Sequence, residues 1–219
     1  MGNELRRIAD EPNRNNPETA TRHGEWSHAF SSRDLASIAV LAALWSASED
    51  ILGAQLHAVH LPFTGVTLTA IAVFLMVTER ALVPRRGSTI LMGIVVALLK
   101  MFSIGGVVLP PMIAIFMEAL AVELTTTAGG VNRLSAAIGG ILAEMWTLVQ
   151  AFVAPLLFGV GMLSMYRMVV SSGSQLLGFA LADAIAILVV LIVLHGVVGA
   201  VAGLVGWRFS VTAKRLLAR

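Results

Sequence analysis

The sequence predicts an all-α integral membrane protein built as a compact bundle of six transmembrane helices. Of its 219 residues, 57% are hydrophobic and 13% charged, and the mean hydropathy is +0.85. A soluble domain usually has about 45–50% apolar and about 25% charged residues, so this chain has too little polar surface to cover a water-soluble globule. At about 20 residues per crossing, the length leaves no room for a separate soluble catalytic domain.

Residues 1–34 differ from the rest because they hold five Arg and six acidic residues and no apolar run. This composition is typical of a disordered polar tail. The tail lacks the apolar core of a signal peptide, so we expect it to stay in the cytoplasm. We therefore expect three parts: the tail 1–34, a membrane domain 35–206 and a basic C-terminal segment 207–219.

From residue 35 onward, apolar runs alternate with short polar breaks. The second and third runs have about 15 residues, roughly 22 Å of helix against a hydrocarbon core of about 30 Å. Either flanking residues complete these two spans or they lie inside the bundle. The last run is long enough to tilt or project. The expected spans are Leu35–Ile51, Thr64–Val77, Ser88–Phe102, Met112–Thr127, Leu134–Phe158 and Leu176–Gly206.

The positions of Lys and Arg predict the orientation of the bundle. With six spans, all of the fifteen basic residues except Lys100 and Arg167 fall on one side. Because cytoplasmic flanks accumulate Lys and Arg, both termini are expected to be cytoplasmic. The basic residues thus flank membrane spans, and no nucleic-acid partner is expected.

The expected outer loops are Leu52–Phe63, Ser103–Pro111 and Gly159–Gln175. The first two are apolar and contain Gly and Pro. Such segments are tolerated at membrane depth where they line a protein cavity, so we expect them to fold back as a lid. The alternative is that they lie in the headgroup region.

Several polar side chains fall inside the expected spans, where ionisable groups are costly and usually face the bundle interior. Lys100, Glu118, Gln150 and Asp183 come from four different spans at a similar depth in the outer half. Trp146 lies one turn deeper than Gln150 on the same helix face. A layer with charges, an amide and an aromatic ring suits a small-molecule pocket. The alternative is a structural network such as a Lys100–Glu118 pair.

Three further ionisable residues lie elsewhere in the spans. Glu123 and Glu144 are expected nearer the inner side, where they would serve conformational coupling or stay protonated. His195 is expected to be a core histidine with one backbone partner.

The sequence offers little for metal or catalytic chemistry. His57 and His60 form an H-x-x-H in the first outer loop, a weak candidate metal site. There is no Cys, so thiolate ligands and thiol nucleophiles are excluded. Neither a Walker A motif nor H-E-x-x-H or G-x-S-x-G occurs. We expect no cofactor and no catalytic activity of the chain itself.

Small residues on the first expected span predict a close contact with another helix. Ala39, Ala43 and Ala47 recur every four residues, which leaves a flat stripe. Such a stripe serves internal packing or a partner subunit.

From about residue 33 to 206 the chain resembles a substrate-specific S component of an energy-coupling factor (ECF) transporter, a type of ABC transporter. The resemblance depends on the alanine-striped first helix, the outer loop ending Leu-Pro-Phe-Thr-Gly, the Gly-Gly loop in Lys100–Pro111, the polar stretch Met117–Ala119 and the Gly-rich last helix. Thr64–Glu123 is also similar to the cobalt- and nickel-specific relatives. Those begin Met-His, whereas this chain begins Met-Gly-Asn, which disfavours a metal substrate.

The resemblance implies high-affinity capture of a vitamin-like micronutrient at the outer face of a prokaryotic cell membrane. Delivery would require a transmembrane coupling subunit and two ATPase subunits, with Ala39, Ala43 and Ala47 as the docking surface. Acids outnumber the single Lys in the expected pocket, which favours a cationic ligand such as a thiamine precursor. The implied substrate-binding residues are Lys100, Glu118, Trp146, Gln150, Asp183, His57 and His60.

Two other functions remain open from the sequence. One is a self-sufficient secondary transporter or an ion or metal permease that uses Glu118, Glu144 and Asp183. The other is an intramembrane enzyme with paired carboxylates. Glu118 and Glu123 lie about 140° apart around a helix, so they do not converge.

Overall fold

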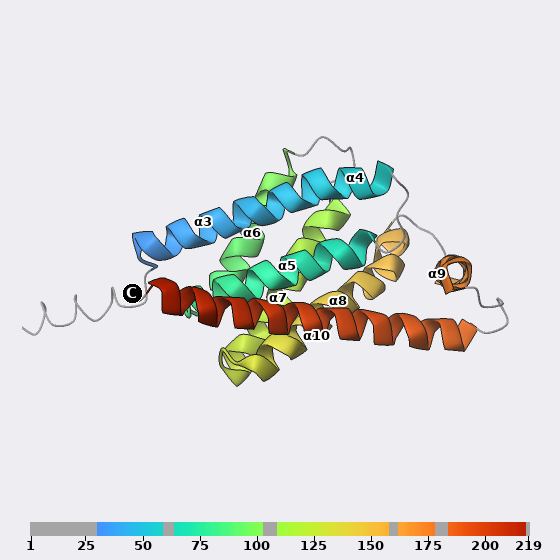
Figure 1. Ribbon diagram of the computed structural model, residues 1–219. Coiled ribbons are helices and arrows are strands. Elements are labelled where there is room, and N and C mark those ends of the chain that lie inside the picture. Colours follow the sequence, from blue (N-terminus) through green and yellow to red (C-terminus); the bar gives the residue numbers. More distant parts are fainter. Residues whose placement is uncertain (1–29, 59–63, 103–108, 158–161, 178–183, 218–219) are drawn as a thin grey trace, which may run out of the picture. The chain divides into compact units, whose positions relative to one another are not determined.

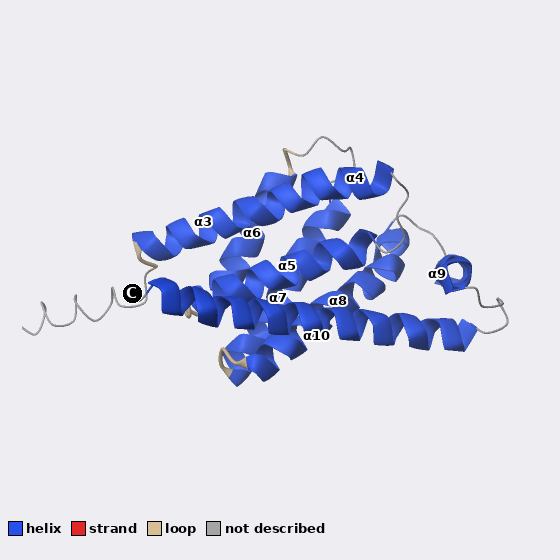
Figure 2. Cartoon of the chain, in the orientation of Figure 1, coloured by secondary structure: helices blue, strands red, loops and turns tan. Residues whose placement is uncertain are grey.

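The computed structural model describes residues 30–58, 64–102, 109–157, 162–177 and 184–217, and every regular element in these ranges is a helix (Figures 1 and 2). This confirms the all-α class for the described part of the chain. Residues 1–33 and Asp34–Arg219 form two separate units, and the bundle belongs to the second. The helices are α3 (Ser32–Ala47), a π-helical turn η2 (Ser48–Leu52), α4 (Gly53–Ala58), α5 (Thr64–Leu82), α6 (Ser88–Lys100), α7 (Leu109–Gly129), α8 (Arg133–Leu157), α9 (Met162–Leu177) and α10 (Ala184–Leu217).

Four helical stretches in the described part are long and apolar enough to cross a membrane. They support a membrane-embedded protein, because soluble folds rarely contain several such helices. Helix α6 is apolar but has only 13 residues, about 20 Å of rise. The four stretches are Ser32–Leu56, Thr64–Leu82, Leu109–Gly129 and Ile185–Leu216.

The prediction of a third outer loop over Gly159–Gln175 is wrong for most of that range, because Met162–Leu177 forms helix α9. This helix is amphipathic: Ser164 and Arg167 are exposed, while Val170 is buried in a cluster with Ile187 and Leu191 of α10. The serines and glycine between 171 and 174 suggested a loop. In the helix, Ser172 is exposed, whereas Gly173 is buried and lies against Ile187 of α10.

Helix α10 also differs from the expected last span. It is described from Ala184 and continues to Leu217, so most of the expected C-terminal segment 207–219 extends the helix. Helices α3, η2 and α4 follow one another without a break and are counted here as one helical segment. The described part then has seven helical segments, whereas six were expected.

The closest helix packing joins α8 to α10. A Cβ on Gly140 would collide with the carbonyl of Gly199, and one on Gly203 would collide with the carbonyl of Ala136. Only glycine lets the two backbones approach this closely. These contacts define the α8–α10 seam, in which the two helices run antiparallel.

Two ion pairs hold the ends of the first helical stretch. Asp34 in α3 accepts a hydrogen bond from Arg85 Nε at 2.8 Å, and Asp50 in η2 accepts one from Lys100 Nζ at 2.7 Å. Arg85 precedes α6 and Lys100 ends it, so α3 runs in the same direction as α6. Ile38, Ala42 and Trp45 form the buried face of α3.

Candidate functional site

Hydrogen bonds between two threonine hydroxyls and a glutamate carboxyl group link three helices inside the bundle. Thr69 Oγ1 of α5 lies 3.0 Å from Glu118 Oε1 of α7 and 3.0 Å from Thr147 Oγ1 of α8. Because Thr69 has one hydroxyl hydrogen and donates it to Glu118, it accepts the hydrogen of Thr147. Glu118 is 5% exposed. We call Thr69, Glu118 and Thr147 the three-helix polar site.

Other acidic groups lie near this site. Both Glu49 of η2 and Glu144 of α8 are close enough to Glu118 to interact with it electrostatically. Glu144 is fully buried, and neither of its carboxyl oxygens has a hydrogen-bond partner among the described residues. The surroundings of Glu118 are therefore acidic.

Trp146 adjoins the three-helix polar site in sequence. Its indole Nε1 is buried and has no hydrogen-bond partner among the described residues. Buried indole N–H groups usually find an acceptor, so this N–H is a polar group that the described side chains leave unsatisfied.

Lys100 is engaged by Asp50, as described above, and no Lys100–Glu118 ion pair is present in the described part of the chain. Gln150 Nε2 lies 3.5 Å from the carbonyl of Pro110, at the start of α7. Pro110 and Glu118 are eight residues apart, about 12 Å along the helix axis. Gln150 is thus less than one turn from Thr147 of the three-helix polar site along α8, but its amide contacts α7 about two turns from Glu118.

Three expected site residues receive no side-chain placement. Asp183 and His60 lie outside the described residues, and the side chain of His57 in α4 is not described. Among the residues that are described, no three His, Asp or Glu side chains gather closely enough to hold a metal ion.

The three alanines of α3 are all exposed. They lie on a different face from Ile38, Ala42 and Trp45, which pack inward. Within the described chain the alanine stripe is therefore not used for internal packing.

A second polar cluster, which the sequence did not suggest, surrounds Arg80. This residue was expected in a cytoplasmic loop, but it lies in the last turn of α5 and is 3% exposed. Arg80 Nε donates to Thr126 Oγ1 at 3.1 Å, and its Nη2 lies 3.5 Å from Glu123 Oε1. The signal that could have found this cluster is the Glu-Arg pair at 79–80 together with the Thr triplet at 125–127.

Glu123 also caps the N-terminus of α6. Its carboxylate accepts hydrogen bonds from the backbone N–H groups of Gly87 at 2.7 Å and Thr89 at 3.2 Å. Gly87 has a positive φ of 84° and no side chain to cap the helix, so the acid from α7 takes this role. The Arg80–Glu123 cluster therefore connects α5, α6 and α7 through an ion pair and hydrogen bonds.

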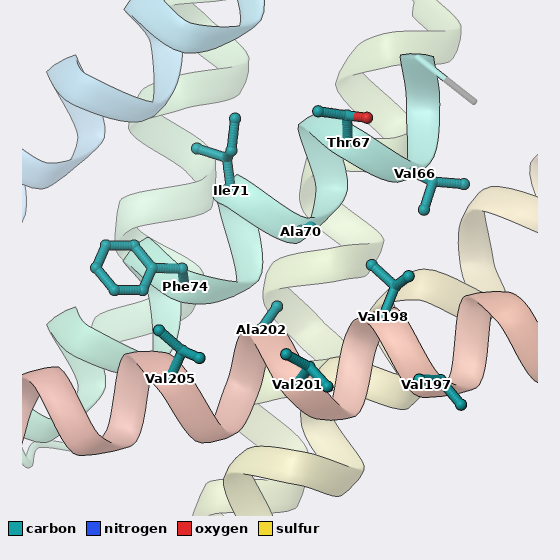
Figure 3. Close-up of a pocket in the computed structure, with 10 residues that line it drawn as sticks. All are labelled: Val66, Thr67, Ala70, Ile71, Phe74, Val197, Val198, Val201, Ala202 and Val205. Carbon is teal, nitrogen blue, oxygen red and sulfur yellow. The ribbon is translucent and has the colours of Figure 1, made fainter. Parts of the chain in front are cut away.

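An apolar groove of about 570 Å³ lies between α5 and α10 (Figure 3). Thr67 is the one labelled residue in it with a side-chain oxygen. None of the expected site residues lines the groove. Its lining residues are Val66, Thr67, Ala70, Ile71 and Phe74 of α5, and Val197, Val198, Val201, Ala202 and Val205 of α10.

The chain matches no protein-family model, no curated protein and no solved structure at a significant level.

Proposed function

We propose that the chain is the substrate-binding membrane subunit of an ECF-type importer for a vitamin or similar micronutrient. The observation that carries the proposal is the exposed stripe of Ala39, Ala43 and Ala47 on α3. Flat small-residue stripes allow close helix contact inside a membrane, and this one faces away from the described bundle. It suits docking on a transmembrane coupling subunit that two ATPase subunits drive.

The proposed ligand site begins at the three-helix polar site and includes Trp146. The acidic surroundings of Glu118 favour a ligand with a cationic group, because Lys100 is already engaged by Asp50. The proposed orientation places both termini in the cytoplasm of a prokaryote and the site in the outer half of a six-span bundle.

Native mass spectrometry of the purified chain tests the ligand proposal. We expect a small cationic molecule to co-purify with the wild-type chain and to be lost in Glu118→Gln. Thr69→Val is the matched variant: it keeps the side-chain volume but removes the hydroxyl bonded to Glu118, so it should weaken retention without abolishing it. Equal retention by all three proteins would refute this site.

A second candidate is a self-sufficient cation transporter. It is favoured by the fully buried carboxyl of Glu144, which has no hydrogen-bond partner among the described residues. Uptake by the purified chain in liposomes without ATPase subunits would establish it in place of the importer subunit.

A further inference from the structure

Helix α9 carries a polar face that is exposed and positively charged. Four polar residues follow one another in steps of three or four, the spacing of neighbours on one helix face. They are Ser164, Arg167, Ser171 and Gln175. All of them except Ser171 are exposed. Arg167 is the one charged residue of the helix, which contains no Asp or Glu, so the positive charge of this face is not balanced within α9.

The other face of α9 is fixed to the first turns of α10. Val170 is buried in a cluster with Ile187 and Leu191 of α10. Gly173 is also buried, and a Cβ at this position would collide with the Ile187 side chain. Glycine therefore allows the two helices to approach closely here. Because Val170 and Gly173 are held against α10, the polar face of α9 turns away from α10.

The length of α10 places this contact at one surface of the membrane. Ile187 and Arg208 are 21 residues apart, about 32 Å of helical rise, which matches a hydrocarbon core of about 30 Å. The stretch between them contains no Asp, Glu, Lys or Arg. Val193 and Val201 in this stretch are exposed, as expected for side chains that face lipid. With Arg208 in one headgroup region, Ile187 and the contacting helix α9 lie at the other.

The direction of α9 differs from that of α10. Figure 1 shows α9 nearly end-on, whereas α10 runs across the view, so the two helices cross at a steep angle. Since α10 is long and apolar enough to cross a membrane, a helix that crosses it steeply runs along the membrane surface. Amphipathic helices with a basic residue on the polar face suit this position, because the polar face meets headgroups and water.

We propose that α9 is an interfacial helix that lies flat in the headgroup region opposite Arg208, with the Arg167 guanidinium bound to the phosphate of an anionic phospholipid. A guanidinium matches the geometry of phosphate oxygens and forms paired, charge-assisted hydrogen bonds with them. None of the ion pairs of the described residues includes Arg167. This role is independent of the proposed function, because it requires only that α10 crosses a membrane.

The depth of two spin labels on α9 tests its position. The chain contains no Cys, so each single-cysteine variant carries one thiol for labelling. Ser164→Cys and Gln175→Cys place labels on the same exposed face, eleven residues or about 16 Å apart along the helix. Val197→Cys is the matched control, because Val197 is exposed on α10 about 15 Å from Ile187, near the middle of the hydrocarbon core.

The measurement is the collision rate of each label with oxygen and with a water-soluble nickel chelate, for the full chain in vesicles of phosphatidylcholine and phosphatidylglycerol. The labels at 164 and 175 should lie at headgroup depth, within about 5 Å of each other, one helical turn. The label at 197 should lie far deeper. A depth difference of about 16 Å between 164 and 175, labels that contact water alone, or labels shielded from both reagents by protein would each overturn the proposal.

Titration with phosphatidylglycerol, followed by native mass spectrometry, tests the role of Arg167. Arg167→Gln should bind this lipid about fivefold more weakly, because a basic side chain near an anionic surface contributes about 1 kcal/mol. Arg167→Lys keeps the charge and should stay close to the wild type. The assignment of Arg167 is overturned if Arg167→Gln binds the lipid as tightly as the wild type, or if Arg167→Lys loses as much affinity as Arg167→Gln.

Discussion

Lys100 Nζ lies 2.7 Å from Asp50 Oδ1, and this ion pair ties the end of the first helical stretch to the end of α6. Arg85 and Asp34 form the corresponding pair at the other end. The acids are 16 residues apart and the bases 15, or about 24 Å and about 22 Å of helix, so the two pairs match in spacing. Together they fix how α3 lies along α6.

Removing the acid that pairs with the more buried base should destabilise the protein. Asp50→Asn leaves the Lys100 ammonium, whose side chain is 15% exposed, without its carboxylate. We expect the free energy of unfolding to fall by about 1–2 kcal/mol, more than the typical surface pair contributes. Thermal unfolding measures the loss. Asp34→Asn is the matched control, because its partner Arg85 is 38% exposed, and it should cost less. An equal or larger loss in Asp34→Asn would contradict this account of α3.

Alanine substitutions at two glycines of α10, three residues apart, should change the stability of the protein in opposite directions. At Gly199 a Cβ would collide with the Gly140 carbonyl, whereas at Gly196 no atom lies within 4 Å. Gly199→Ala should lower the free energy of unfolding by at least about 2 kcal/mol, because the helices must separate. Gly196→Ala should be neutral or stabilise by up to about 1 kcal/mol through helix propensity. Similar unfolding temperatures for both variants would show that the α8–α10 seam is wider than described.

The Arg80–Glu123 cluster should be among the sites most sensitive to a single substitution. Glu123→Gln removes the negative charge that faces Arg80 and weakens the cap of α6. Breaking one partner of a buried ion pair costs about 3–5 kcal/mol, so we expect poor folding or a large drop in Tm. Removing both charges, as Arg80→Met/Glu123→Gln, should recover part of the stability. A double variant as unstable as the sum of the single variants would mean that the two side chains do not interact.

The alanine stripe gives the proposed function its sharpest mutational test. Ala43→Trp adds a bulky ring on the exposed stripe and should prevent assembly with the coupling subunit while ligand binding persists. Co-purification of the tagged chain from its native membranes measures assembly. Leu44→Trp is the control, because Leu44 is also exposed on α3 but points about 100° away. Loss of ligand binding in Ala43→Trp, or equal loss of assembly in both variants, would argue against a docking role.

Composition and hydropathy were sufficient for the all-α class and for the long apolar helices. Helix α7 was expected over Met112–Thr127 and occupies Leu109–Gly129, because its apolar run ends in a clear Gly-Gly break. His195 was correctly expected to have a backbone partner, since a lone imidazole inside an apolar helix finds the nearest carbonyl oxygen.

Long-range partners could not be predicted in the same way. Lys100 could pair with any acid at its depth, and only the arrangement of α3 beside α6 selects Asp50. Arg80 was assigned to a loop because Lys and Arg mark membrane flanks, yet the Thr and Glu side chains of α7 allow its burial. The close approach of Gly140 and Gly199 depends on the register of the α8–α10 seam, which no single-helix pattern encodes.

The most direct test of the proposed function is uptake into vesicles of the molecule that co-purifies with the chain. Vesicles containing the chain together with its native membrane partners should accumulate this molecule only when ATP is supplied, and Ala43→Trp should abolish the accumulation. Liposomes containing the purified chain alone should bind the molecule without accumulating it. Accumulation by the chain alone would contradict the assignment as an importer subunit and would establish an independent transporter.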